Sequence, residues 1–121
     1  MITPVSKIIM LMAAVAVLAA AALDPVGRYE LSATMRGKPA ALVATIVKQQ
    51  DGSLGGELSG NTINTVKIVD VRVSDSTVKF AVDAAQDVRA NFTMVISGSK
   101  VTGEWSMPGD SSRFEGRRVA P

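Results

Sequence analysis

Apolar and polar side chains alternate along most of the chain after its first 25 residues. The first such stretch shows the pattern clearly, because Tyr29, Leu31, Ala33 and Met35 are separated by polar residues. A period of two is typical of a β-strand with one buried and one solvated face. We therefore predict strands at 28–35, 40–48, 53–59, 63–73, 77–83, 88–97, 100–106 and 114–118.

Two of these strands leave their inward face open to question. The second predicted strand has apolar residues on both faces, so either the set Leu42, Ala44 and Ile46 or the set between them can point inward. The fourth changes parity after Ile68, because its valines before and after that residue fall on opposite faces. One extra residue near Ile68-Val69, a β-bulge, would bring both sets to one face.

The segments between the strands are short and rich in turn residues. Asp51-Gly52 is the strongest hairpin signal, because glycine accepts the positive φ of a tight turn. No connection is long enough to carry the helix of a parallel crossover. We therefore predict an all-β fold, an eight-stranded antiparallel up-and-down meander that closes into a small barrel and so leaves no exposed edge. A barrel of about eight strands is either filled by side chains or holds one small ligand.

A weak internal repeat accompanies this pattern. Residues 54–59 (LGGELS) match residues 101–106 (VTGEWS) at an offset of 47 residues. The match indicates either a duplicated four-stranded half or two hairpins that converged on the same inward glycine and outward glutamate.

The N-terminal segment has a different character. Residues 8–22 are an unbroken apolar run after Lys7, which is the only charged residue before Asp24. As a helix the run would span about 22 Å, short of a hydrocarbon core of about 30 Å. The basic start, the apolar run and the small residues Ala20-Ala21-Ala22 are typical of a secretory signal peptide. We expect residues 1–22 to be this signal and residues 23–121 to be the β-barrel domain, periplasmic or secreted and free of the membrane after cleavage. The alternative is an uncleaved membrane anchor.

Composition excludes several classes of function. The chain has no cysteine and no histidine, which rules out a disulfide framework, a Cys/His zinc site and a Ser-His-Asp triad. Its 13 Lys and Arg and 11 Asp and Glu are interspersed and give a net charge of +2, so we expect no nucleic-acid partner.

The acidic residues do not suggest chemistry either. A glycosidase needs two carboxylates that face one cleft about 5–9 Å apart. Glu57 and Glu104 occupy matching positions of the repeat, but both lie on the outward parity. The chain also lacks an Asp-x-Asp-x-Asp calcium loop and a glycine loop that opens a helix. We therefore expect no enzyme activity, no metal and no cofactor.

A family resemblance rests on the two ends of the predicted barrel. Gly27-Arg28-Tyr29 at the start of the first strand resembles the Gly-x-Trp opening of the calycin superfamily, which includes the lipocalins, avidins and fatty-acid-binding proteins. The resemblance implies an up-and-down barrel in which an aromatic of the first strand packs near an arginine of the last. Arg118 is the candidate for that arginine. The chain has Tyr for Trp, no disulfides and a single Trp, so biotin is not an expected ligand. It is also similar in general character to small exported bacterial barrel proteins of unassigned function.

Two inward residues allow more than one role. A buried arginine without a partner is costly, so Arg118 should stack on Tyr29 or bond strand-end carbonyls. Alternatively, it binds an anion at the mouth of the barrel. Trp105 is the largest inward side chain and either fills the core or lines a ligand pocket.

The leading hypothesis is a barrel that binds a small, mainly apolar ligand in its interior. The candidate ligand-binding residues are Tyr29, Phe80, Phe92, Trp105 and Arg118. The small inward residues at 33, 56, 90, 103 and 116 would leave a cavity beside them. The alternative is a filled barrel that binds an envelope protein or inhibits a protease. A contiguous apolar cavity of about 300 Å³ or more would favour the first.

Overall fold

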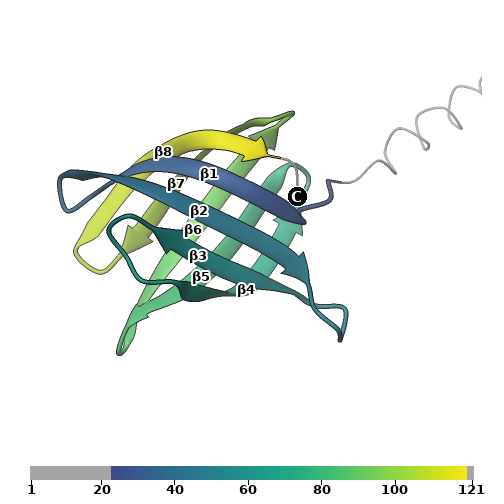
Figure 1. Cartoon of the computed structure of the whole chain (residues 1–121), viewed down its shortest axis with the longest axis horizontal. Coiled ribbons are helices and arrows are strands. Elements are labelled where there is room, and N and C mark those ends of the chain that lie inside the picture. The colour runs from purple at the N-terminus through teal and green to yellow at the C-terminus, as the bar shows by residue number, and fades with distance from the viewer. Residues whose placement is uncertain (1–22, 120–121) are drawn as a thin grey trace, which may run out of the picture.

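The computed structural model describes residues 23–119, and these residues form one closed barrel of eight strands (Figure 1). The strands are β1 (Gly27–Met35), β2 (Lys38–Lys48), β3 (Leu54–Gly60), β4 (Val66–Ser74), β5 (Thr77–Ala85), β6 (Val88–Ser97), β7 (Lys100–Met107) and β8 (Asp110–Val119). The predicted signal peptide lies outside the described residues. Within residues 23–119 no helix is long and apolar enough to cross a membrane.

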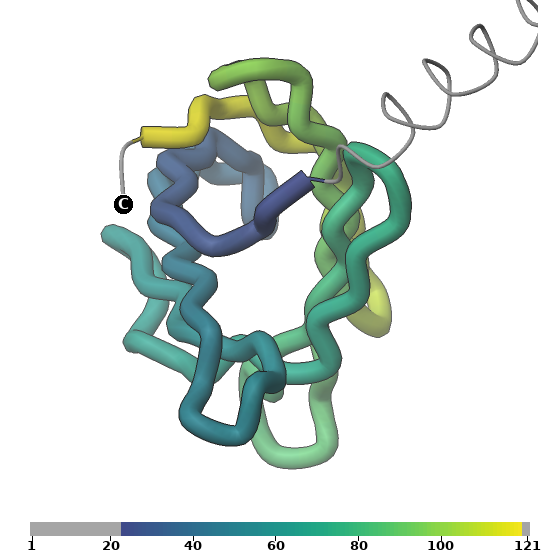
Figure 2. Tube along the Cα trace, turned by 90° about the vertical axis from the view of Figure 1, so that its right-hand side faces the viewer, coloured from purple at the N-terminus to yellow at the C-terminus, as the bar shows by residue number. Residues whose placement is uncertain are grey.

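Each strand pairs antiparallel with the next, and β8 pairs with β1 to complete the ring. The closing pair runs over six residue pairs, among them Tyr29 with Arg118. Figure 2 looks along the barrel and shows the chain returning to its starting strand. The predicted eight-stranded antiparallel meander and its closure are therefore confirmed.

The inward face of β2 is set by its partner. Tyr29 and Leu31 of β1 lie directly opposite Ala44 and Leu42 of β2. Residues opposite one another in an antiparallel pair point to the same side of the sheet. The unambiguous alternation of β1 therefore places Leu42, Ala44 and Ile46 inside, where each is at most 1 % exposed.

The bulge of β4 lies slightly later than predicted. Its register with β5 shifts between Val69 and Arg72, and Asp70 has a φ of 54°. Val69 therefore stays on the outward parity, and Val71 is the first residue after the bulge to pack against the core. The carboxylate of Asp70 lies 2.6 Å from Nη1 of Arg89, an exposed contact that ties the bulge to β6.

Several other boundaries differ from the prediction; β5, for example, continues to Ala85, two residues beyond its predicted end. Residues 61–65 form a loop rather than the start of β4, although Ile63 still packs on the core. The turn between β1 and β2 contains only Arg36 and Gly37, so Lys38 already belongs to β2. β8 begins at Asp110, four residues before Phe114, because Asp110–Ser112 pair with the end of β7.

A row of aromatic side chains crosses the interior. Phe80, Phe92 and Trp105 are successive cross-strand partners on β5, β6 and β7. The rings of Phe80 and Phe92 are stacked with centroids 4.9 Å apart, and the Phe114 ring lies 6.0 Å from that of Phe92. All four are at most 3 % exposed.

The inward glycines do not leave empty space, contrary to expectation. A Cβ built on Gly56 or Gly116 would collide with the backbone carbonyl of Thr45 or Glu30 on the neighbouring strand. A Cβ on Gly103 would collide with the carbonyl of Thr93 and with the Phe114 ring. These glycines therefore permit close approach of neighbouring strands, as expected where a sheet bends to close.

Candidate ligand-binding site

The two ends of the barrel differ in how they are closed. At one end lie the N-terminal segment and the β2–β3, β4–β5 and β6–β7 turns, and we call this the closed end. At the other lie the β1–β2, β3–β4, β5–β6 and β7–β8 connections, and we call this the open end. Figure 1 shows the closed end on the right, where the described N-terminal segment enters β1, and the open end on the left.

Tyr29 and Arg118 tie the N-terminal segment across the closed end. Nη2 of Arg118 donates hydrogen bonds to the carbonyls of Asp24 and Val26, the latter at 2.7 Å. The Tyr29 hydroxyl donates to the carbonyl of Pro25 at 2.5 Å. The Arg118 guanidinium carbon also lies 5.5 Å from the centroid of the Tyr29 ring. Three successive carbonyls of the segment are thus bound by two side chains, which is the predicted closure contact.

The neighbouring residues explain why Arg118 takes this role. A Cβ on Gly27 would lie 3.2 Å from Nε of Arg118, so the glycine that begins β1 makes room for the guanidinium. Arg117, on the outward parity, instead lies with its Nη2 3.4 Å from the Glu30 carboxylate. The two hydrogen bonds from Nη2 of Arg118 therefore support the closure role over the anion-binding alternative.

Burial has a measurable consequence at Tyr29, which is fully buried. Desolvation raises the pKa of its phenol, although the Arg118 charge opposes the shift. An unfolded tyrosine ionises near pH ~10. We therefore expect this group's stabilising contribution to be complete below pH ~10 and to be lost as pH rises toward the higher folded-state pKa. Because Tyr29 is the only tyrosine, phenolate absorbance reports on it alone.

A control isolates this effect from the titration of lysines at similar pH. Tyr29→Phe should remove the phenolate signal and the part of the alkaline stability loss that belongs to this residue. Ionisation of the native protein at or below the pH of the unfolded chain would contradict the burial of Tyr29.

The open end contains a cavity of about 600 Å³. Ten of its lining residues are apolar: Met35, Leu58, Ile63, Val66, Val82, Ala84, Ala90, Phe92, Trp105 and Met107. The remainder are Arg36, Lys38, Thr62, Asn64 and Asp110. The cavity therefore has an apolar wall that descends from the strand ends to the aromatic row and a polar rim formed by the connections.

Trp105, whose side chain borders the cavity, carries an unusual buried polar group. Its side chain is 2 % exposed. Its indole Nε1 is the one buried side-chain nitrogen or oxygen in the described part of the chain without a hydrogen-bond partner. Buried indole N–H groups usually find an acceptor, so this donor is an exception; it is inaccessible to solvent and is not presented to the cavity.

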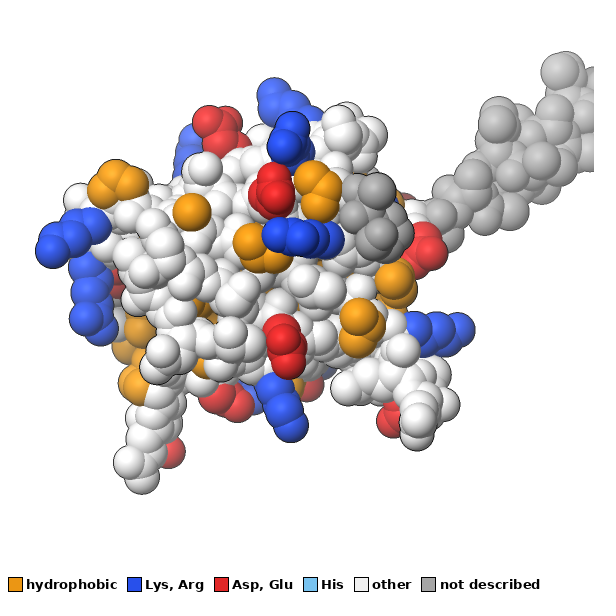
Figure 3. Space-filling view, viewed as in Figure 1, with side chains coloured by type: hydrophobic (Ala, Val, Ile, Leu, Met, Phe, Trp, Pro, Cys, Tyr) orange, Lys and Arg blue, Asp and Glu red, His pale blue; other side chains and the backbone are white. Residues whose placement is uncertain are grey.

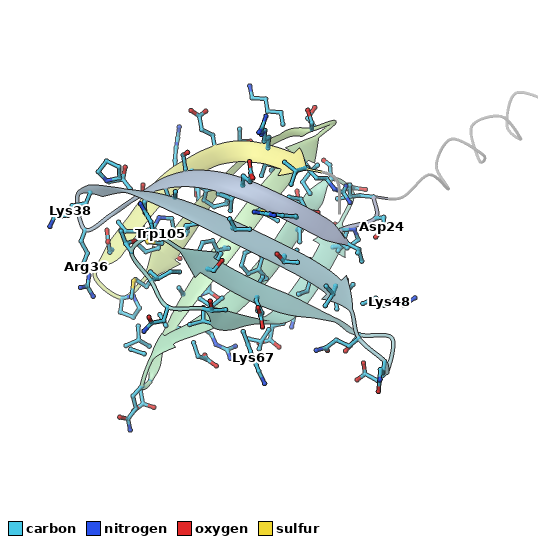
Figure 4. The ribbon with its side chains drawn as sticks, viewed as in Figure 1. Asp24, Arg36, Lys38, Lys48, Lys67 and Trp105 are labelled. Carbon is cyan, nitrogen blue, oxygen red and sulfur yellow. The ribbon has the colours of Figure 1, made fainter. Side chains whose placement is uncertain are left out.

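The rim carries more positive than negative charge. Figure 4 shows Arg36 and Lys38 at the same end of the barrel as Trp105, with Asp24 and Lys48 at the other end. The one acidic lining residue, Asp110, accepts a hydrogen bond from the backbone N–H of Arg36 at 3.1 Å. In Figure 3 basic side chains project from this end, whereas charges of both signs are scattered over the rest of the visible face.

A second hollow, of about 1020 Å³, opens in the barrel wall. It lies where β3 and β4 separate, because these strands pair over only three residues, Gly56–Leu58 of β3. Lys67, Glu57 and Asp70 line it together with Val47, and all four are exposed. We place the candidate site in the smaller interior cavity, because it is lined by Phe92 and Trp105 of the buried aromatic row, whereas the larger hollow is not.

The five candidate ligand-binding residues therefore lie in three places. Phe92 and Trp105 line the interior cavity. Phe80 stacks behind Phe92 and is not part of the cavity wall. Tyr29 and Arg118 lie together at the closed end.

Sequence reasoning missed the rim residues and the two lining methionines, Met35 and Met107. These residues lie in or next to alternate connections between strands, and an up-and-down meander brings alternate connections to the same end of the barrel. That signal was available in the strand order.

The two glutamates that occupy matching positions of the internal repeat lie far apart in the barrel. Glu57 and Glu104 are exposed on β3 and β7, which are four strands apart in the ring and thus on opposite walls. Within residues 23–119 no cluster of three acidic, cysteine or histidine side chains could hold a metal ion.

In comparisons with known proteins, no protein-family model matches the chain, and no curated protein is significantly similar to it. The architecture is consistent with a calycin-like barrel at the level of fold. Because one fold serves many functions, the barrel alone does not specify what this protein does.

Proposed function

We propose that the barrel binds a small, mainly apolar ligand in the cavity at its open end. The observation that carries this proposal is the cavity of about 600 Å³ with ten apolar lining residues. Ligand sites usually occupy about 300–1,000 Å³, with predominantly apolar walls and a few polar groups. The cavity has this composition, since its polar residues are confined to the rim.

The difference between the closed end and the open end of the barrel supports the same proposal. The contacts of Tyr29 and Arg118 secure the closed end, so the opposite end is free to admit a ligand without loosening the closure. We further propose that the protein is a calycin-like barrel with a binding rather than a catalytic role. The Tyr29–Arg118 contact between the first and last strands supports this assignment.

A titration with the neutral fluorescent probe N-phenyl-1-naphthylamine tests the proposal. Trp105 is the only tryptophan of the chain and lies in the cavity wall. We expect saturable probe fluorescence with energy transfer from Trp105. Ala90 also lines the cavity and is 4 % exposed, so Ala90→Leu should fill part of the space and weaken binding several-fold.

Ala85→Leu is the matched control, because Ala85 is exposed at the end of β5 and does not line the cavity. It should leave probe binding unchanged. Equal binding by both variants, or no saturable binding by the folded wild type, would contradict an interior site.

The second candidate function is a docking module for an envelope protein or a protease. The wall hollow between β3 and β4 favours it, because that hollow is larger than the interior cavity and opens on the outer surface. If this function is the true one, the neutral probe should fail to bind the interior.

We also propose that the barrel acts outside the cytoplasm after removal of residues 1–22. The support is the sequence pattern alone: a basic start, an apolar run and a small-residue end. Mass spectrometry of the exported protein should find an N-terminus at Leu23 or a neighbour. An intact Met1 in a membrane fraction would contradict the proposal.

A further inference from the structure

One pair of neighbouring strands in the ring, β3 and β4, is paired over only part of its length. The pairing ends at Gly56 opposite Ile68. The same register would bring Leu54 opposite Asp70, but the bulge at Asp70 diverts β4. Within the described chain, residues 71–74 therefore have no neighbouring strand on the side away from β5, and we call them the β4 edge. At such an edge alternate residues present their backbone N–H and C=O groups without a partner.

The β4 edge also exposes apolar side chains. Val73 lies opposite the fully buried Val78 and so points to the same, inner side of the sheet. It is nevertheless 38 % exposed, because no residue of β3 lies beside it. Val71 has the same parity and lines the wall hollow. An extended chain that pairs with the β4 edge would cover both valines.

On the outward side of the same hairpin, two cations have no counter-charge. Arg72 and Lys79 are direct cross-strand partners and both are exposed. Neither forms an ion pair within residues 23–119. The neighbouring carboxylate of Asp70 contacts Arg89 instead, and all four residues line a hollow of about 300 Å³ on the outer surface. Like charges directly opposite one another destabilise a sheet, so a carboxylate placed beside Arg72 would relieve this repulsion.

We propose that the β4 edge is a docking site for an extended segment of a partner protein, in which an acidic residue lies between two apolar residues. The segment adds a strand to β4, with its carboxylate beside Arg72 and Lys79 and its apolar side chains against Val71 and Val73. Successive residues of a strand point to opposite faces, so the alternation of the β4 edge requires the same alternation in the partner. In strand addition, backbone hydrogen bonds give affinity and alternate side chains give specificity.

This inference goes beyond the interior ligand, because none of the residues of the β4 edge lines the interior cavity. Lys67 marks the neighbouring part of the barrel wall in Figure 4, away from Trp105. A ligand inside the barrel and a strand on its wall can therefore be tested separately.

Fluorescence polarisation of a labelled heptapeptide that alternates valine and glutamate, at low ionic strength, tests strand addition. We expect saturable binding that weakens with added salt, because the cations are exposed. A peptide with lysine in place of glutamate should bind more weakly. Two further analogues, each N-methylated at one set of alternate residues, block the two edges of the peptide in turn, and one of them should lose binding. No binding by the parent peptide, equal binding by the lysine peptide, or full binding by both methylated analogues would overturn the proposal.

The double variant Arg72→Gln/Lys79→Gln should weaken binding of the acidic peptide by about three- to tenfold, the range expected for two exposed ion pairs. Lys100→Gln/Arg113→Gln is the charge-matched control, since both residues are exposed and lie on β7 and β8. This control should retain wild-type affinity. Equal loss in both double variants would mean that net charge, not the β4 edge, attracts the peptide, and would overturn the proposal.

Intermolecular NOEs locate the peptide. We expect them to the methyl groups of Val71 and Val73, whereas NOEs to Met35 and Met107 alone would place the peptide in the interior and overturn the proposal. Sedimentation velocity of the free protein should show a monomer. A dimer with protected amides at residues 71–74 would make a second copy the occupant and would also overturn it. If N-phenyl-1-naphthylamine binds but the peptide does not, the inference fails and the proposed function stands; the reverse result leaves the inference standing and removes the proposed function.

Discussion

Phe92→Ala is expected to lower the free energy of unfolding by about 3–5 kcal/mol. Phe92 is 1 % exposed and stands at the centre of the aromatic row, stacked on Phe80 and in contact range of Phe114. Its removal loses the transfer free energy of the ring and enlarges a cavity that already borders it. Urea denaturation followed by circular dichroism measures the change.

Val95→Ala provides the control on the same strand. Val95 is 42 % exposed and points outward from β6, so its truncation should change stability by no more than about 0.5 kcal/mol. A loss below about 1 kcal/mol for Phe92→Ala would contradict the inward orientation of the aromatic row.

Arg118→Ala is expected to cost about 1–3 kcal/mol, whereas Arg117→Ala should be nearly neutral. Arg118 donates to two carbonyls of the N-terminal segment and lies over the Tyr29 ring. Hydrogen bonds from a charged donor contribute about 1.5–3 kcal/mol, reduced here because Arg118 is partly exposed. The Arg117 contact with Glu30 is an exposed ion pair, a class that usually contributes about 0–1 kcal/mol.

A double-mutant cycle of Tyr29→Leu with Arg118→Ala separates the closure contact from general loss of packing. Coupling of more than about 0.5 kcal/mol is expected, since the two residues are cross-strand partners that bind the same segment. Hydrogen exchange of the backbone amides near the start of β1 should also accelerate in Arg118→Ala. Zero coupling, or a larger effect at Arg117, would contradict the assigned closure.

The fold was predictable because strand alternation is a local property of the sequence. Tyr29, Phe92 and Trp105 each sit in stretches of clean period two, and their inward orientation follows from that pattern. The ambiguous parity of β2 needed its partner, because only the pairing of Leu42 with Leu31 fixes which face is inside. The bulge near Asp70 was anticipated in kind, but its position depends on how β4 separates from β3.

The candidate site was less predictable because it depends on packing between strands. Gly56, Gly103 and Gly116 suggested open space in the sequence, but neighbouring strands approach closely enough to fill it. The space instead lies at the open end, where Met35 and Met107 line the wall. Periodicity shows that Tyr29, Arg118 and Trp105 all point inward. It does not show how far along the barrel axis each residue lies, so it could not separate the closed end from the cavity.

The most direct test of the central claim is an NMR map of where a neutral apolar probe contacts the folded barrel. The methyl groups of Met35 and Met107 line the interior cavity, whereas Val47 lies on the outer wall beside the β3–β4 hollow. Intermolecular NOEs from N-phenyl-1-naphthylamine to both methionine methyls, with none to Val47, are the result that an interior site predicts. NOEs to Val47 with none to either methionine would contradict it and would favour docking on the outer surface.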